Sequence, residues 1–172
     1  MKRLFLAAVL FSFIGNVNAQ AEETKINKTE RFKHSLGFGA GISTGYGLSY
    51  RYFGDKFGAQ VNFSPYKDET RVNVSSGVTF LYRLGDIKEY SFYLYQGNHF
   101  YFDEHTETQY DYYSDSETTI ENKSKFFNHG IGVGLEYVTS DRISFNGMLG
   151  YGSQKDFKII SMSVEAGVYF KF

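Results

Sequence analysis

Residues 160–172 read ISMSVEAGVYFKF, and this stretch decides the fold. Steps of two back from Phe172 to Ile160 meet only apolar side chains, whereas the residues between them are small, polar or charged. A period of two held over thirteen residues predicts a β-strand with one apolar face and one wet face. The predicted strand is longer than the five or six residues that are typical, at about twice that length.

The same alternation recurs seven more times along the chain. Ser76 and Leu81 interrupt the fourth repeat, and the parity of the fifth is blurred over 96–99, where we expect a β-bulge. None of the repeats shows a helical period of 3.6, so the sequence predicts an all-β domain of eight strands. The seven upstream strands are predicted at about 34–43, 46–53, 57–64, 71–84, 90–102, 126–137 and 142–152.

The apolar side chains are too large a set for the inside of a small barrel. The chain holds 18 Phe and 15 Tyr, and most lie on the apolar face of a predicted strand. Eight strands enclose an interior that side chains just fill, which suits the complementary set of Gly, Ser, Asn and Gln. The pattern therefore favours an eight-stranded antiparallel up-and-down transmembrane β-barrel. A soluble periplasmic lipocalin-like binding barrel, with its apolar face inward, is the alternative.

Loop lengths and aromatic bands agree with the membrane interpretation. The even-numbered connections, at 54–56, 85–89 and 138–141, are short, and a long polar stretch at 103–124 falls on the fifth. Outer-membrane barrels keep short turns in the periplasm and longer loops outside. Aromatic residues gather at both strand ends, as expected for two membrane interfaces. They are Tyr50, Tyr52, Phe57, Tyr82, Phe92, Tyr137, Phe170 and Phe172 at one end, and Phe63, Tyr66, Phe100, Phe102, Phe127, Tyr151 and Phe157 at the other.

The first residues have the order of a secretory signal. Lys2 and Arg3 precede an apolar run over 4–14, and a small-x-small cleavage site follows at 17–19. We expect a cleaved signal peptide at 1–19, a polar stub at 20–33 and a barrel domain at 34–172. The chain has no cysteine, so it has no disulfide framework. The mature chain is mildly acidic, which argues against a nucleic-acid partner.

Taken together, the signal peptide, the strand alternation and the ending VYFKF resemble small eight-stranded outer-membrane barrels of the OmpA/OmpX-like superfamily, in the style found among Bacteroidetes. The resemblance implies a place in the bacterial outer membrane, with its lipids and the barrel-assembly machinery as partners. It also implies that Val168, Phe170 and Phe172 form the signal that this machinery recognises. It implies no particular biochemical activity and no cofactor.

Five charged residues fall on the inward face of the predicted strands. An isolated buried charge is very unfavourable, so we expect these side chains to form ion pairs that fix the shape of the barrel. A gated ion path is the alternative, although eight strands leave no room for a continuous water column. The five residues are Arg51, Arg83, Glu136, Glu165 and Lys171.

The stretch 103–124 is the most distinctive surface feature, because it holds seven carboxylates against the single Lys123. It is predicted to be a flexible, solvated acidic loop. The functional alternatives are a contact surface and a calcium site, but the spacing of its acids does not match an EF-hand. No metal ligand is therefore assigned. The candidate contact residues are Tyr110, Tyr112, Tyr113, Asp111, Asp115 and Glu117.

An outer-membrane lipid-modifying enzyme is a second alternative. His99, His105 and His129 are the candidate bases, but no serine stands beside any of them in a recognisable motif. We therefore predict a structural or adhesin-like surface protein without catalytic residues and without a pore.

Overall fold

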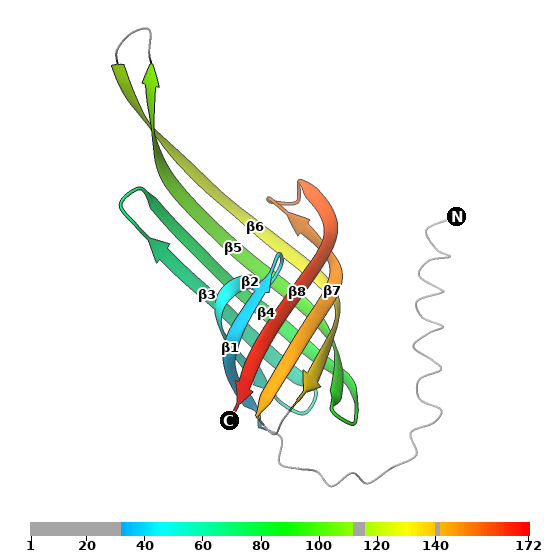
Figure 1. Ribbon diagram of the computed structural model, residues 1–172. Coiled ribbons are helices and arrows are strands. Elements are labelled where there is room, and N and C mark those ends of the chain that lie inside the picture. Colours follow the sequence, from blue (N-terminus) through cyan, green and yellow to red (C-terminus); the bar gives the residue numbers. More distant parts are fainter. Residues whose placement is uncertain (1–31, 112–115, 140–141) are drawn as a thin grey trace, which may run out of the picture. The chain divides into compact units, whose positions relative to one another are not determined.

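The computed structural model describes residues 32–111, 116–139 and 142–172. The expected signal peptide at 1–19, and all of the stub except 32–33, lie outside these residues. Among the described residues no helix is long and apolar enough to cross a membrane. Eight strands are present, as the sequence predicts (Figure 1). They are β1 (His34–Gly41), β2 (Gly45–Phe53), β3 (Phe57–Lys67), β4 (Arg71–Ile87), β5 (Tyr90–Asp111), β6 (Ser116–Val138), β7 (Ile143–Gln154) and β8 (Ile159–Lys171).

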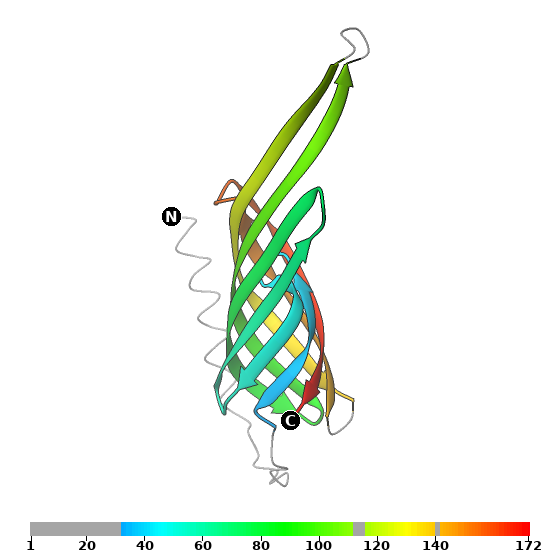
Figure 2. The ribbon, with the colours of Figure 1, turned by 90° about the vertical axis from the view of Figure 1, so that its left-hand side faces the viewer.

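The strands form one closed antiparallel barrel with up-and-down connections. Each strand pairs with the next in sequence, and β8 pairs with β1 through a register that runs from Ser35↔Lys171 to Gly41↔Glu165. The start of β1 and the end of β8 therefore lie at the same end of the barrel (Figures 1 and 2). The connections β2–β3, β4–β5 and β6–β7 are at this end too. We call the opposite end the outer end.

The two faces of the barrel wall have opposite chemistry. Phe57 and Ile160 point outward and are 70% and 80% exposed, whereas Ser49 and Thr79 point inward and are completely buried. Water would favour the reverse arrangement, because exposed apolar surface of this extent is unfavourable in a monomeric soluble protein. The exposed set includes large apolar residues from all eight strands. The barrel is therefore of the transmembrane type, and the inward face of the described strands is mainly polar, unlike that of a lipocalin-like barrel.

The expected bulge at Gln96–His99 is wrong. The β5 register is continuous through these residues with both β4 and β6, and the irregularity lies instead between Arg83 and Gly85 on β4. Gln96 and Asn98 occupy outward positions, so two polar side chains blurred the alternation although the backbone pleat is regular. The alternation pattern was misleading because these two outward residues are polar, and not because the backbone is irregular.

The expected flexible loop at 103–124 is also largely a pair of strands. The ladder between β5 and β6 is unbroken up to Asp111↔Ser116, and it carries both strands well beyond the rest of the barrel (Figures 1 and 2). Thr106, Thr119 and Ile120 are β-branched residues that favour strands. A cross-strand ion pair between Lys123 and Glu104 (3.2 Å) supports the register.

A small apolar core fills the end of the barrel where the termini meet. Leu81, which interrupts the apolar alternation of β4, points inward and is 2% exposed. It belongs to a cluster of buried side chains whose members come from β2, β4, β5 and β7. The cluster consists of Phe53, Leu81, Tyr93, Tyr95 and Met148.

Candidate functional site

The connection between β1 and β2 folds into the barrel and closes it. Ser43 and Thr44 lie in this turn, yet both are essentially inaccessible to solvent. Gly45 and Gly47 have φ values of 77° and 115°, a region that side-chain-bearing residues rarely adopt. These two glycines let the chain reverse within the lumen and continue as β2. We call residues 42–45 the plug turn.

Glycines on three neighbouring strands make room for the plug turn. A side chain at Gly77 would begin 1.7 Å from the Thr44 carbonyl oxygen, and one at Gly97 would begin 2.7 Å from the Ser43 carbonyl oxygen. A side chain at Gly130 would meet the Ser43 hydroxyl at 2.6 Å. Only glycine at these positions of β4, β5 and β6 leaves the space that the turn occupies.

Glu165 on β8 fastens the plug turn to the wall. Its carboxylate accepts hydrogen bonds from the hydroxyl groups of Ser43 and Thr44, and from the Ser163 hydroxyl at 2.8 Å. The Ser43 backbone N–H donates at 3.3 Å. Glu165 is 2% exposed, and within the described residues its carboxylate bonds to these donors and not to a cation. Glu165 therefore departs from the expected ion pairing, and hydroxyl groups stabilise the carboxylate instead.

Three further side chains, from β3, β5 and β6, hold the plug turn. The Ile42 carbonyl accepts from His99 Nδ1 (3.0 Å) and from Asn128 Nδ2 (3.2 Å). Asn62 Nδ2 donates to the Thr44 carbonyl at 3.0 Å. Buried backbone groups of an irregular turn need such partners, since no water reaches them. The turn is thus held by side chains from four of the surrounding strands.

The contacts of His99 bear on the expectation that no serine stands beside a candidate catalytic histidine. Its Nδ1 must carry a proton to donate to the Ile42 carbonyl, so Nε2 is free to accept from the Ser75 hydroxyl at 3.0 Å. A serine therefore does lie beside this histidine, although no sequence motif indicates it. Ser75 is completely buried, so a substrate has no access to its hydroxyl. The pair holds the plug turn.

A polar network lines the outer mouth of the barrel above the plug turn. Asn73 accepts from the Tyr46 hydroxyl at 2.8 Å and donates to Asp103 at 3.1 Å. Arg71 Nε donates to the same Asp103 oxygen at 2.8 Å. The hydrogen bond from Arg71 lowers the pKa of Asp103 below its usual range. Tyr46 continues the alternation of Leu48 and Tyr50 along β2, yet its hydroxyl bonds to the inward-facing Asn73.

Three of the expected lumen charges meet near the other end. Glu136 Oε1 lies 3.0 Å from Lys171 Nζ and 4.0 Å from Arg51 Nη1. Arg51 also donates to Gln60 Oε1 and lies 4.2 Å from the centre of the Tyr169 ring. Glu136 thus interacts with two cations, and Arg51 has Gln60 and the Tyr169 ring as further partners. None of these charges is therefore buried without a partner.

Arg83 lies apart from this group. Its Nε is 3.8 Å from Asp86 Oδ1 on the same strand, and its guanidinium carbon lies 4.2 Å from the centre of the Phe53 ring. The sequence placed it with the lumen charges because of its parity. Arg83 keeps that inward parity, because it is paired with the buried Tyr93, but its partners lie nearer the end where the termini meet.

The projecting part of the β5–β6 hairpin is a charged ladder. Lys123 Nζ lies 3.2 Å from Glu104 and 3.1 Å from Glu121, and His105 lies 3.3 Å from both Asp103 and Glu107. Hydrogen bonding to Lys123 lowers the pKa of Glu121. In the described part of the chain, no group of three His, Cys, Asp or Glu could hold a metal ion. Of the candidate contact residues, Tyr112, Tyr113 and Asp115 lie outside the described residues. Tyr110, Asp111 and Glu117 are placed only as strand positions in the ladder.

The outward face of β5–β7 carries polar residues at membrane depth. His129 pairs across the ladder with Asn98 on one side and with Ser153 on the other. The Ser153 hydroxyl is buried and has no hydrogen-bond partner, so His129 does not activate it. The neighbouring Gln96 and Asn98 amides bond to each other at 2.9 and 3.0 Å.

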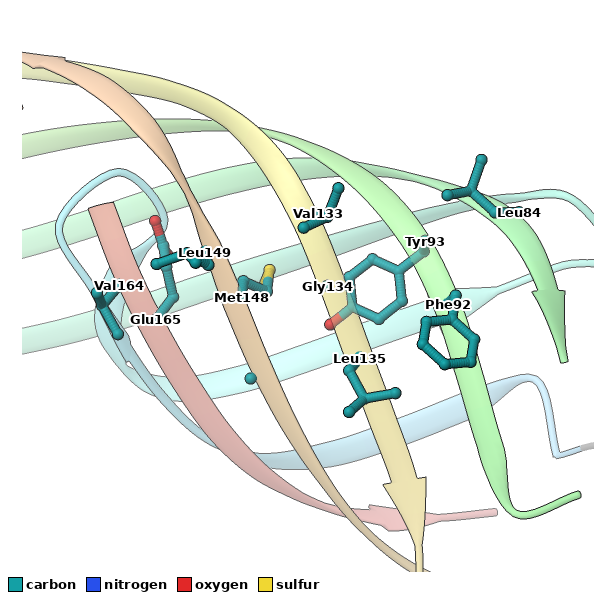
Figure 3. A pocket seen from close by; sticks show the side chains of 11 residues that line it. Leu84, Phe92, Tyr93, Val133, Gly134, Leu135, Met148, Leu149, Val164 and Glu165 are labelled. Carbon is teal, nitrogen blue, oxygen red and sulfur yellow. The ribbon is translucent and has the colours of Figure 1, made fainter. Parts of the chain in front are cut away.

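An apolar depression of about 540 Å³ lies lower on the same wall (Figure 3). Gly147 opens it, since a side chain there would meet no atom within 4 Å. Figure 3 shows the Tyr93 ring lying across β6 at Gly134, on the interior side of the depression. Its outward lining consists of Leu84, Phe92, Val133, Leu135, Leu149 and Val164.

The residues of the expected assembly signal share the lipid-facing side of β8. Val168, Phe170 and Phe172 are 39%, 48% and 52% exposed. Val168 and Phe170 are paired with both β7 and β1, and the Phe172 N–H donates to the His34 carbonyl at 2.9 Å.

Several solved structures are similar to this chain. The N-terminal β-barrel domain of Pseudomonas aeruginosa OprF is 17% identical over 81% of this chain and 95% of that one, with a TM-score of 0.48. Neisserial surface protein A is 16% identical over 81% and 94%, with a TM-score of 0.41. Ail, the attachment invasion locus protein of Yersinia pestis, is 13% identical over 81% and 96%, with a TM-score of 0.41. The sequence matches no protein-family model and no curated protein. The barrel is defined by this chain's own strand pairing.

Proposed function

We propose that this protein is an integral barrel of a bacterial outer membrane, that it conducts no solutes, and that it serves as a structural and surface-contact protein. The observation that carries this proposal is the inverted wall of the barrel, with large apolar side chains outside and buried Ser, Thr, Asn and charged side chains inside. Lipid is the solvent that stabilises such a wall, and a closed barrel leaves no unpaired strand edge in it.

The filled lumen supports a role other than transport. The plug turn, the buried Arg51–Glu136 pair and the rings of Tyr93, Tyr95 and Tyr169 succeed one another along the inside, and each of these tyrosines is at most 2% exposed. A water path would require these side chains to be wetted, and their burial therefore supports a barrel that conducts no solutes. Reconstituted barrels should therefore give no stepwise current in a planar bilayer, and regular single-channel openings would contradict this part of the proposal.

The β5–β6 hairpin is the part of the molecule best suited to meet an external partner. It projects beyond the other strands and carries an excess of carboxylates (Figure 1). A surface of this charge favours a basic partner and repels polyanions. The described carboxylates best placed for such contacts are Glu104, Glu107 and Glu121, whose ion pairs with Lys123 and His105 lie at the surface. Asp103 is instead committed to Arg71 and Asn73.

Binding of intact cells to basic and acidic surface proteins tests this role. A variant with Glu104→Gln, Glu107→Gln and Glu121→Gln should lose binding to basic partners, because the screened attraction of several charges is removed. Glu69→Gln, in the β3–β4 turn at the same end, is the matched control and should bind normally. Equal binding by all three proteins would rule out the hairpin as an electrostatic contact surface.

An enzyme is not favoured by the geometry. His99 meets a serine that no substrate can reach, and the serine next to His129 forms no hydrogen bond with it. General base catalysis needs the base within hydrogen-bond reach of the nucleophile. Mass spectrometry of the acylation pattern of outer-membrane lipids, with and without this protein, should therefore show no difference.

A further inference from the structure

Uncharged polar side chains gather on one part of the lipid-facing wall. Gln96, Asn98, His129 and Ser153 are outward residues of three adjacent strands, and the register places Asn98, His129 and Ser153 in one row. We call these four residues the polar patch. Elsewhere between the two aromatic bands, the outward residues of the described strands are apolar or aromatic, apart from Ser76 on β4.

The polar patch lies at the level of the outer aromatic band, since Tyr151 is two residues below Ser153 on β7. The pair Phe100↔Phe127 is two residues above Asn98↔His129 on both strands, which is about 7 Å along the ladder. At this depth a lipid's chains join its head group. Polar groups facing hydrocarbon are unfavourable unless they find a partner.

The hydrogen bonding of the polar patch is incomplete. The two amides satisfy each other only in part, since each side chain has further donor or acceptor capacity. Ser153 as a residue is 7% exposed, and its hydroxyl is buried without a partner, so the two amides and His129 are the groups that a ligand can reach. The His129 ring packs against the Phe157 ring, at 4.6 Å between centroids. The patch thus offers donors and acceptors that the barrel itself does not use.

Charged groups stand above the polar patch, and apolar surface lies below it. Lys125 Nζ lies 5.3 Å from the centre of the Phe102 ring, and the Lys155 N–H donates to Asn128 at 2.9 Å. Lys158 follows in the same β7–β8 turn, where Asp156 is occupied by the Phe127 N–H. Four residues below His129, Val133 lines the apolar depression of about 540 Å³. The wall therefore changes from cationic to polar to apolar along one vertical line.

From this order we infer that the wall of β5–β7 binds a single phosphorylated lipid of the outer leaflet, whose chains are joined to the head group by amide or ester linkages. Lys125 and Lys155 face the phosphate, and the polar patch hydrogen-bonds the carbonyl, N–H or hydroxyl groups of the linkage region. One chain lies in the depression that Gly147 opens. The inference rests on the proposed place of the barrel in an outer membrane.

A second copy of the chain fits this wall less well. In a twofold dimer the same patch meets itself, so Lys125, Lys155 and Lys158 of both copies would come together. The repulsion between six ammonium groups opposes such a contact, whereas a phosphate neutralises them. An anionic amphiphile is the occupant that matches both the charge and the apolar depression.

Native mass spectrometry of the barrel released from nanodiscs provides the test. The discs contain phosphatidylcholine with a small fraction of either lipid A or phosphatidylglycerol, and the fraction of barrels that retains one lipid is measured. The patch variant carries Gln96→Leu, Asn98→Leu and His129→Leu, and the lysine variant carries Lys125→Gln and Lys155→Gln. Ser76→Val and Lys67→Gln, outward residues of β4 and β3, are the matched controls.

Lipid A should remain bound to the wild type and to both controls, and its retention should fall about tenfold in each of the two variants. Loss of two hydrogen bonds accounts for a change of this size. Phosphatidylglycerol has a phosphate but only ester linkages, so its retention should fall more in the lysine variant than in the patch variant. Unchanged retention in the patch variant would overturn the inference, as would a dimer that only this variant dissociates. A wild-type chain that does not enter the discs as a heat-modifiable barrel would instead refute the proposed function.

Discussion

The plug turn and the projecting part of the β5–β6 hairpin lie at the same end of the barrel, but they extend in opposite directions. The plug turn enters the lumen, where Ser43 and Thr44 are buried, and the hairpin continues outward as a two-stranded ladder. The turn is short and carries small hydroxyl side chains that a carboxylate and three glycine positions can accommodate. The hairpin carries charges that need water. Size and charge thus decide which connection fills a narrow barrel.

Filling the space of the plug turn should have the largest effect on the stability of the barrel. Gly77→Val puts branched carbons where the Thr44 carbonyl oxygen lies, so the turn must leave or the barrel must distort. We expect the free energy of unfolding in vesicles to fall by about 3 kcal/mol or more. Urea titration monitored by heat modifiability measures this. Gly147→Val is the control, since a side chain there meets no atom, and equal losses in both variants would contradict a filled lumen.

Weakening the hydrogen bonds that hold the plug turn should have a smaller effect on the free energy of unfolding. Glu165→Gln keeps the size of the side chain but replaces charge-assisted hydrogen bonds with neutral ones, and an amide cannot accept from all of its present donors. We expect a loss of about 1–3 kcal/mol. Amide exchange of residues 43–45 should become faster, whereas exchange in β3 should not. Unchanged protection of the turn would show that the glycine-lined space alone holds it.

Acidification should loosen the base of the hairpin before the barrel. The pKa of Asp103 is lowered by Arg71, so its contribution to stability is complete above the ordinary Asp value of about 3.9 and is lost as pH falls through the lower folded value. Hydrogen exchange at residues 101–105 should rise over that range. Asp103→Asn should remove the pH dependence, and a dependence that persists in this variant would assign it to another group.

Removing the far part of the hairpin should have the smallest effect on the barrel. Replacing residues 107–120 with a two-residue turn keeps Asp103 with its partners, and the deleted segment pairs only with itself. The free energy of unfolding should change by less than about 1 kcal/mol, because exposed ion pairs contribute little. Urea titration of the two barrels decides this. A larger loss would mean that the hairpin and the lumen are not independent.

Strand number, face and topology were predictable from the sequence, because a period of two is a local property of neighbouring residues. The inward positions of Arg51, Glu136 and Glu165 could be predicted from the alternation within each strand, without knowledge of the neighbouring strands. The bulge expected at 96–99 was wrong because Gln96 and Asn98 are polar residues on the lipid side. The flexible loop expected at 103–124 was wrong because charged residues form a ladder when their cross-strand neighbours are of opposite sign, as Lys123 and Glu104 are.

The sequence by itself therefore determined an eight-stranded barrel with an apolar outside, since that follows from alternation along each strand. Only the tertiary structure decided that the first outer connection turns inward and that Ser75, His99 and Glu165 converge on it. It also decided that Asn98, His129 and Ser153 lie in one row on the lipid-facing wall. Contacts of this kind join residues tens of positions apart, and the register between strands, which no single strand encodes, fixes which side chains meet.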